Sequence, residues 1–468
     1  MTISLPGGTD AGNWSEDTGR SYTSRGRNRH QPGAPVMGRP VAGLSLALRA
    51  GIRSTRAGYH GETRRHLIRR GKHSRKMKQR LTVSMKGDKP MDAIQQNCLT
   101  AILTFLLLPV VGLGTAPDRA AIDELVKPFL KDKPYLALVV GITRPEGHQV
   151  FGYGEVALEG KKQVPDKATI FEIGSITKIF TGTLLADRVL SGVVRLDDPV
   201  QKYLADDLTV PRRDERAITW LHLATHTSSL PRVPPFFVLS ALLKGETYNP
   251  YDKYDQAALQ RTLASLTLNR PIGSRFEYSN LGIGLLGLAL AQAAKAKSYE
   301  DLLMQRMVRP LGLTDTRMQL SAEQSKRFAP GHDKDGKPTS PWTFACLQAC
   351  GGLRSTARDL LLFADAAMGR KKTPLADAFR MAQQPWRETC RKGESVGLCW
   401  FRQEQAISKS DMLWHNGATG GYRSFLALAP EKGVGIVLLS NSPHALDALG
   451  VAILKKMAEE ENGPGSRR

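Results

Sequence analysis

The sequence predicts a mixed α/β fold of the α+β type, in which helices flank an antiparallel sheet and a mainly helical lobe is inserted at about residues 196–340. Six β-rich runs carry this prediction, two before residue 160 and four after residue 390: 135–143, 149–157, 395–403, 411–415, 422–429 and 433–440. The chain between them is dominated by helix-period patterns and loops. Strands at both ends of a chain with helices between them favour one sheet assembled from both ends.

The remaining elements follow from local patterns. The segment 145–148 predicts a hairpin turn between the first two strands, and 430–433 predicts one between the last two. Helical periodicity or apolar runs predict five helices, at 120–130, 179–190, 281–294, 355–367 and 444–461, the fourth of them capped by Ser355 or Thr356.

Composition allows two or three domains, or one large domain with an insertion, in 468 residues with 41% hydrophobic side chains. The net charge of +22 is concentrated at the N-terminus, where residues 1–90 hold 19 Lys and Arg against 5 Asp and Glu. This basic stretch is rich in Gly, Arg, Ser and Pro, so we expect a disordered extension and no nucleic-acid partner. The alternative, nucleic-acid binding by residues 1–90, would be sensitive to salt.

An apolar run at 99–113, interrupted by Pro109, is too short for a typical membrane span and resembles the core of a signal peptide. We expect a signal peptide at 91–116 with cleavage after Gly114, a folded domain at 117–461 and a tail at 462–468. The protein would then be periplasmic or secreted, without a stable membrane span, and we expect a monomer. Three explanations of residues 1–90 stay open: a start codon at Met77, Met85 or Met91, an extended leader, or a basic arm with a signal anchor.

Four cysteines remain in the expected mature chain, Cys346, Cys350, Cys390 and Cys399. In an exported domain they permit two disulfides in three connectivities, and free or buried thiols are equally compatible with the sequence. No cysteine–histidine spacing matches a zinc site, so we predict no metal and no cofactor.

Ser175 stands three residues before Lys178, between Gly174, which allows a tight turn, and the apolar run at 179–190. A serine at that helix start would lie in the positive field of the helix N-terminus. A lysine three residues further on lies on the same helix face, within reach of the serine hydroxyl. The spacing predicts a serine nucleophile activated without a histidine. Taken alone, it also fits an N-cap serine and a surface lysine.

Two further motifs favour the nucleophile. Tyr278-Ser279-Asn280 precedes the apolar helix at 281–294, and His415-Asn416-Gly417-Ala418 lies near the last strands. In this order, and with flanks such as Pro310-Leu311-Gly312 and Gly351-Gly352-Leu353, the three motifs resemble the class C β-lactamase and penicillin-binding D-Ala-D-Ala peptidase family over about residues 118–460. The resemblance implies a β-lactamase/transpeptidase-like fold with Ser175 in the cleft between the sheet and the helical lobe.

The resemblance also implies roles for individual residues. Ser175, Lys178 and Tyr278 would be catalytic, with Ser175 attacking an amide or ester carbonyl to form an acyl-enzyme. The backbone N–H groups of Ser175 and Ala418 would form the oxyanion hole. The residues that contact substrate would be Asn280, His415, Asn416 and Gly417. The residues leave open whether Lys178 or Tyr278 takes the serine proton. In the family that the sequence resembles, the two groups act as one coupled system.

His415 is the main departure from the family, which usually has a lysine at the start of this triplet. Histidine is mostly neutral at pH 7, so we expect weaker selection for carboxylate-bearing substrates. Arg423 either supplies a replacement cation or is a solvated strand residue. For His226 we expect a structural role in its loop, through hydrogen bonds to backbone groups.

We therefore predict a serine hydrolase that acts on β-lactams or D-Ala-D-Ala-type peptides of peptidoglycan. A carboxylesterase of the same family is the alternative. An alternative of a different class is a non-catalytic penicillin or peptidoglycan sensor, which would be acylated without turnover.

Overall fold

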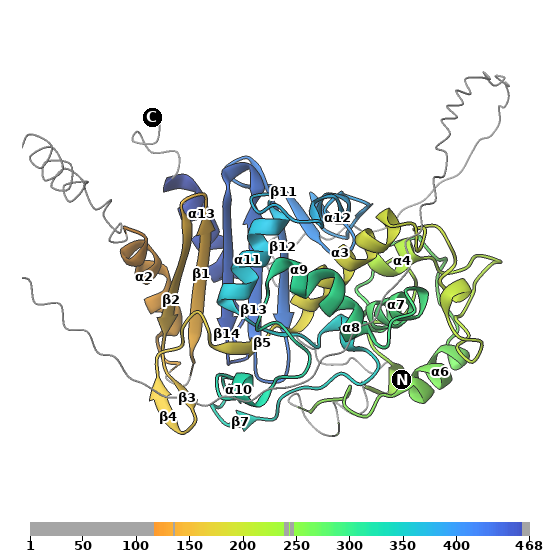
Figure 1. The fold of residues 1–468 in the computed structure, drawn as a ribbon, viewed down its shortest axis with the longest axis horizontal. Coiled ribbons are helices and arrows are strands. Elements are labelled where there is room, and N and C mark those ends of the chain that lie inside the picture. Colours follow the sequence, from red (N-terminus) through yellow and green to blue (C-terminus); the bar gives the residue numbers. More distant parts are fainter. Residues whose placement is uncertain (1–116, 134–135, 238–242, 244–247, 461–468) are drawn as a thin grey trace, which may run out of the picture. The chain divides into compact units, whose positions relative to one another are not determined.

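The computed structural model describes residues 117–133, 136–237, 243 and 248–460. Its centre is an eight-stranded antiparallel sheet that combines strands from both ends of the described chain (Figure 1). In spatial order the strands are β2 (Gly147–Tyr153), β1 (Leu138–Arg144), β14 (Val434–Ser440), β13 (Arg423–Ala429), β12 (Ser410–Ala418), β11 (Phe401–Ile407), β10 (Glu394–Val396) and β9 (Arg387–Glu388). The predicted fold class is confirmed.

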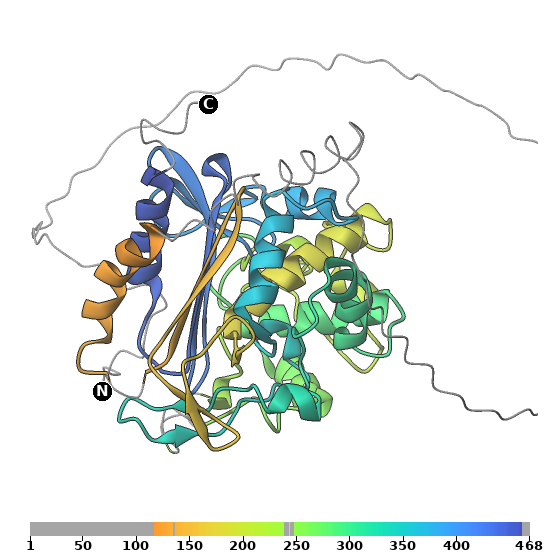
Figure 2. The ribbon, with the colours of Figure 1, turned by 60° about the vertical axis from the view of Figure 1, so that its left-hand side comes forward.

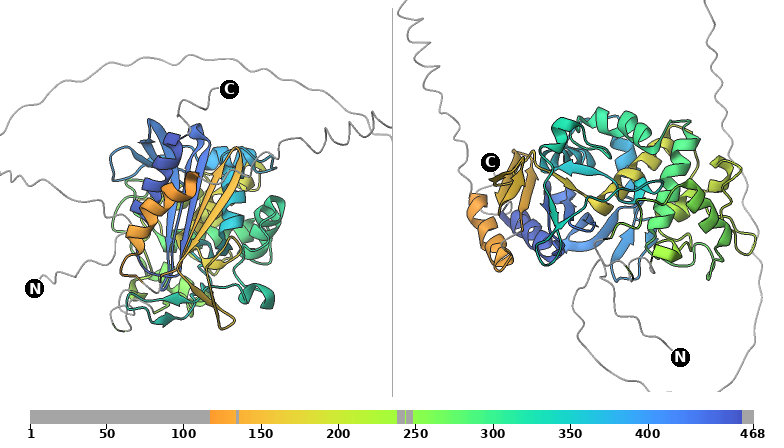
Figure 3. Two further views of the ribbon diagram at one scale, coloured as in Figure 1. Left: turned by 90° about the vertical axis from the view of Figure 1, so that its left-hand side faces the viewer. Right: turned by 90° about the horizontal axis from the view of Figure 1, so that it is seen from below.

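The pairing of β1 with β14 joins the two ends of the chain, with Leu138 opposite Ser440 and Thr143 opposite Gly435. Figure 3 shows the orange strands β1 and β2 beside the blue strands of the C-terminal part. Three short strand pairs lie outside this sheet: β3 (Val156–Leu158) with β4 (Lys161–Gln163), β5 (Ile170–Glu172) with β8 (Arg354–Thr356), and β6 (Gly331–His332) with β7 (Pro338–Thr339).

Helices cover both faces of the sheet (Figure 2). Helices α2 (Pro117–Leu130) and α13 (Asp447–Glu460) pack on one face, and α11 (Ala357–Ala367) packs on the other against β1 and β14. Successive residues of a strand point to opposite faces, so Val437 and Leu439 of β14 join the core under α11 while Ile436 and Leu438 join the core under α13.

The helices and helical turns beyond the sheet are α3 (Thr177–Leu190), α4 (Trp220–Ala224), α6 (Gln256–Ser265), α7 (Asn280–Ala293), α8 (Tyr299–Leu303), α9 (Arg309–Leu311), α10 (Ala322–Ser325), α12 (Ala376–Ala382), η1 (Gly174–Ile176), η2 (Val200–Tyr203), η3 (Met304–Val308), η4 (Gln348–Cys350) and η5 (Pro430–Lys432). Most of them come from residues 174–325 and form, with α11 and α12, the larger hydrophobic core.

Three predicted strands differ in extent from those observed. The run at 149–157 breaks at Gly154, which has a φ of +70°, so that β2 ends there and β3 begins a separate pair. The run at 395–403 divides into β10 and β11 at a turn in which Cys399 has a φ of +65°. The run at 411–415 is instead a nine-residue strand, β12, that includes the whole His415–Ala418 motif.

The predicted signal peptide, the basic extension and the tail at 462–468 lie outside the described residues. Within those residues, no helix is both long and apolar enough to cross a membrane.

Candidate active site

Ser175 lies in the turn η1, directly before α3. Gly174 has a φ of +46°, and a Cβ at this position would lie 2.6 Å from the backbone nitrogen of Ala418. Thr177 closes the turn, because its hydroxyl donates to the Gly174 carbonyl at 2.7 Å and accepts from the Leu353 backbone N–H at 3.1 Å. The turn therefore requires glycine, and it holds Ser175 against the end of β12.

Lys178 lies one turn further along α3 and is fully buried. Its Nζ donates to Ser175 Oγ at 2.9 Å and to the Cys350 carbonyl oxygen at 2.5 Å. The same atom lies 4.8 Å from the centre of the Tyr278 ring. Because a buried lysine is costly without polar partners, these contacts are what hold it beside the serine. The Ser–Lys contact predicted from the spacing is present.

Tyr278 is partly buried, and polar side chains contact its ring. The His226 ring stacks on it, with centroids 4.6 Å apart and planes inclined by 28°. The Arg232 guanidinium carbon lies 5.1 Å from the ring centre, so that two cations, Lys178 and Arg232, contact this one aromatic ring.

The two residues after Tyr278 fix the start of α7. Ser279 is the N-cap, and its hydroxyl accepts from the Gly282 backbone N–H at 2.9 Å and donates to the Pro231 carbonyl at 2.7 Å. Asn280 is the first helical residue, and its Nδ2 donates to the Tyr251 hydroxyl at 2.8 Å. The Asn280 Oδ1 is buried and has no hydrogen-bond partner among the described residues. One of the two polar atoms of this amide therefore lacks a hydrogen bond, and the amide lies two residues from Tyr278 in the sequence.

His226 binds the backbone of this segment. Its Nδ1 accepts a hydrogen bond from the Ser279 backbone N–H at 3.0 Å. Burial, together with the charge of Lys178, holds the pKa of His226 well below its usual value. A neutral imidazole bound to backbone agrees with the structural role expected for it.

His415 is fully buried in β12, and its ring centre lies 6.3 Å from that of Tyr278. Nδ1 contacts the Asn416 carbonyl at 2.6 Å, which requires a proton on Nδ1 and leaves Nε2 as an acceptor. Nε2 is buried without a partner among the described residues. Burial, with the nearby Lys178, lowers the pKa of His415 to about 3. At neutral pH this position therefore carries no positive charge.

The next residues of β12 have different surroundings. The Asn416 amide donates to Asp447 Oδ1 of α13 at 2.6 Å. A Cβ at Gly417 would lie 2.0 Å from the Ile173 carbonyl oxygen, so glycine is needed for β12 to approach the segment before η1. Ala418 is exposed at the end of the strand. The Asn416 side chain is thus bound to α13, while Gly417 and Ala418 lie at the Ser175 turn.

Sequence reasoning missed three groups here. The Cys350 carbonyl and the Tyr251 hydroxyl bind Lys178 and Asn280, and Arg232 contacts Tyr278. A backbone acceptor has no residue-type signature, and Tyr251 lies 29 residues from its partner. Arg232 lies outside the three motifs, so its contact with Tyr278 had no signal in the sequence.

The four described cysteines, Cys346, Cys350, Cys390 and Cys399, are free thiols, so no disulfide joins them. Burial raises the pKa of the Cys350 thiol to about 11. The described part of the chain also shows no group of three or more His, Cys, Asp or Glu side chains that could hold a metal ion.

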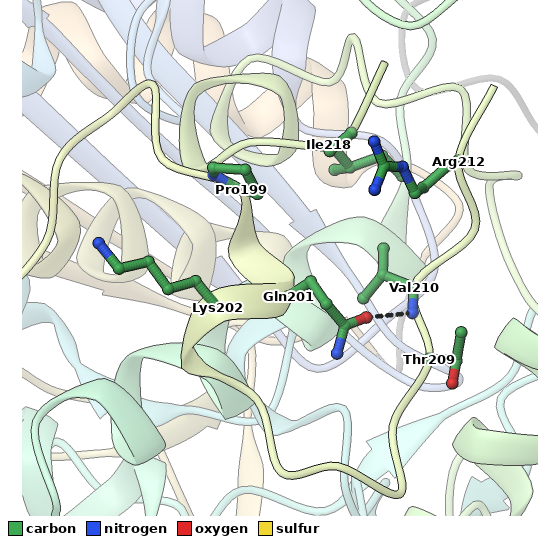
Figure 4. Close-up of a pocket in the computed structure, with 8 residues that line it drawn as sticks. Pro199, Gln201, Lys202, Thr209, Val210, Arg212 and Ile218 are labelled. Carbon is green, nitrogen blue, oxygen red and sulfur yellow. Dashed lines mark hydrogen bonds between the residues drawn. The ribbon is translucent and has the colours of Figure 1, made fainter. Parts of the chain in front are cut away.

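A separate pocket of about 410 Å³ lies among the loops at 199–218, and the Ser175 site contributes no residue to it (Figure 4). Gln201 Oε1 accepts from the Val210 backbone N–H across it at 2.7 Å. Its lining residues are Pro199, Gln201, Lys202, Thr209, Val210, Arg212, Ala217 and Ile218.

Comparison with known proteins agrees with this geometry. The Beta-lactamase family model matches residues 122–455. A β-lactamase of Pseudomonas fluorescens is 27% identical over 70% of this chain and 94% of its own length. The D-alanyl-D-alanine-carboxypeptidase/endopeptidase AmpH of Escherichia coli K12 is 28% identical over 62% of this chain and 76% of its own length.

Solved structures give the same result for the fold. A class C β-lactamase from Rhodobacter sphaeroides superposes with a TM-score of 0.62 at 26% identity, covering 73% of this chain and 98% of that one. Another class C β-lactamase reaches a TM-score of 0.64 at 23% identity, over 74% and 96% of the two chains. The Ser-x-x-Lys turn, the tyrosine beside it and the matched length together lead to one conclusion: the chain belongs to the β-lactamase family of serine hydrolases, with the class C β-lactamases and D-Ala-D-Ala peptidases.

Proposed function

We propose that this protein hydrolyses β-lactams or D-Ala-D-Ala-type peptides through an acyl-enzyme on Ser175. The observation that carries the proposal is the 2.9 Å contact between Lys178 Nζ and Ser175 Oγ at a fully buried lysine. A serine hydroxyl is a weak nucleophile until a neighbouring base takes its proton.

In the proposed reaction Ser175 Oγ attacks the substrate carbonyl while the Lys178–Tyr278 pair takes the hydroxyl proton. The proton then passes to the leaving nitrogen, and the amide bond breaks. In the second half the same pair removes a proton from water, whose oxygen attacks the ester carbonyl. The bond between the carbonyl carbon and Ser175 Oγ then breaks, and the pair returns the proton to Oγ. Tyr278 contacts Lys178 through its ring and is only partly buried, which supports its access to both leaving group and water.

The oxyanion hole of this proposal consists of the backbone N–H groups of Ser175 and Ala418. Two converging donors stabilise the negative oxygen of a tetrahedral intermediate. The close approach of Gly174 to the Ala418 nitrogen supports the pairing, since it brings the backbones of η1 and β12 into contact. The unpartnered Oδ1 of Asn280 and Nε2 of His415 are acceptors that a substrate N–H could satisfy.

A carboxylesterase is the second candidate, and the neutral His415 is the observation that favours it. Without a cation on β12, the site lacks an electrostatic attraction that would favour an anionic substrate over an uncharged ester. Export to the periplasm or medium is also part of the proposal, on the strength of the apolar run at 99–113.

The test uses the purified protein with three substrates: a chromogenic cephalosporin, a D-Ala-D-Ala peptide and a p-nitrophenyl short-chain ester. Turnover of either of the first two, lost in Ser175→Ala, is the expected result. Turnover of the ester alone moves the assignment to carboxylesterase, and a single stoichiometric burst with cephalosporin moves it to a sensor. Hydrolysis that persists in Ser175→Ala contradicts the mechanism.

A further inference from the structure

The surroundings of Tyr278 have a net positive charge. Lys178 and Arg232 both contact its ring, and the two histidines beside it, His226 and His415, are neutral because burial lowers the pKa of each. The acidic residue next to Tyr278 in sequence, Glu277, is paired with Arg270 and Arg275. A site with this balance attracts an anionic ligand.

Arg232 is held in place through its backbone. Its carbonyl accepts from the Asn280 N–H at 2.8 Å and from the Leu281 N–H at 3.3 Å, which ties it to the start of α7. The preceding carbonyl, of Pro231, accepts from the Ser279 hydroxyl. The side chain itself is exposed, and no described Asp or Glu forms an ion pair with it. Its backbone is therefore fixed, while its guanidinium is accessible to a ligand.

The other cations near the site are occupied. Lys178 is buried and donates to Ser175 and the Cys350 carbonyl. Arg423, the candidate considered from the sequence, donates to the Thr419 and Tyr422 carbonyls at 3.1 and 3.0 Å, on the loop beyond β12. Among the described residues, Arg232 is thus the exposed cation that also contacts Tyr278.

We infer that Arg232 binds a carboxylate of the substrate and selects for anionic acyl donors. This rests on the proposed function and narrows it, because it replaces the charge that His415 does not supply. A guanidinium presents paired N–H donors that match the two oxygens of a carboxylate. The β-lactam and peptide substrates carry such a group, and a simple ester does not.

The test compares a chromogenic cephalosporin with the same compound methylated on its carboxylate. Both present the same scissile bond, so the ratio of their kcat/KM values measures selection for the charge. In Arg232→Gln this ratio should fall about tenfold to a hundredfold, mainly through KM of the charged substrate. Arg232→Lys should retain part of the preference. Arg212→Gln, an exposed arginine at the separate pocket of Figure 4, is the matched control and should leave the ratio at the wild-type value.

An unchanged ratio in Arg232→Gln overturns the inference. Equal losses on both substrates overturn it too, since they would show that Arg232 only positions Tyr278. Binding to the Ser175→Ala variant, measured by calorimetry with the charged cephalosporin, separates this result from failure of the proposed function. Weaker binding when Arg232→Gln is added supports the inference even without turnover, and equal binding with and without Arg232 contradicts it.

Discussion

Ser175 and Lys178 form a unit because a helical turn brings residues three apart onto one face, and because burial leaves the lysine few other partners. We expect Lys178→Ala to slow acylation of Ser175 about 10²- to 10⁴-fold, since general acid–base catalysis contributes about that much. Labelling by a fluorescent penicillin measures the rate. Lys202→Ala, an exposed lysine that pairs with Asp198, is the control. Acylation of Lys178→Ala at the wild-type rate would exclude the lysine from the proton transfer.

His415 makes a prediction about acid stability. Its pKa is about 3 in the folded protein and near 6.5 in an unfolded chain. Between these values the unfolded chain takes up a proton that the folded protein refuses, so this residue removes stability as the pH falls from about 6.5 towards 3. We expect the Tm of the wild type, relative to His415→Gln, to decrease between pH 7.5 and pH 5. Parallel Tm curves for the two proteins would show that the buried site accepts the proton.

At the scale of elements, α3 carries Lys178, follows directly after the turn that holds Ser175, and is buried on nearly every side. Gly182 allows this packing, since a Cβ there would lie 1.8 Å from the Leu398 carbonyl oxygen in the turn between β10 and β11. We expect Gly182→Ala to destabilise the protein by about 1–3 kcal/mol and to slow acylation, because α3 must shift. Thermal unfolding is the measurement, with Leu190→Ala, 52% exposed at the end of α3, as control. A wild-type Tm for Gly182→Ala would mean that the turn at Leu398 moves to make room for the added methyl group, and that α3 keeps its position.

The sequence predicted elements well where a long periodic pattern decides them. The run at 281–294 corresponds to α7 (Asn280–Ala293), and 444–461 to α13 (Asp447–Glu460). Errors occurred where one residue with positive φ breaks a β-rich run, as at Gly154 and Cys399. A positive φ in a cysteine has no sequence signature. Gly154 does have one, because glycine often marks a break in a strand, but the β-rich residues on both sides of it favoured one continuous strand.

At the scale of the molecule, the site combines segments far apart in the chain. Ser175, Tyr278 and Ala418 span 244 positions and meet because β12 lies in the sheet built from both chain ends while α3 and α7 pack in the core beside it. Spacing within one helix predicted the Ser175–Lys178 contact directly. The distant partners were predicted only through resemblance to a family, and side-chain contacts such as Asn416 with Asp447 depend on which face of β12 is turned to α13.

Export is a prediction at the scale of the whole molecule. Expression of the full chain in a bacterium should yield a secreted or periplasmic protein whose N-terminus follows Gly114, because the apolar run at 99–113 has the length of a signal-peptide core. N-terminal sequencing of the purified protein measures this. Recovery from the cytoplasm with residues 91–116 intact would contradict it.

The central claim is that Ser175 is the residue acylated during hydrolysis. The most direct measurement is intact-mass spectrometry of the protein mixed with a penicillin and quenched within seconds, followed by peptide mapping of any adduct. The account predicts one added penicillin mass on the peptide that contains Ser175, decaying as substrate is hydrolysed and absent in Ser175→Ala. An adduct on another residue would contradict it, and so would hydrolysis of the penicillin by the Ser175→Ala variant.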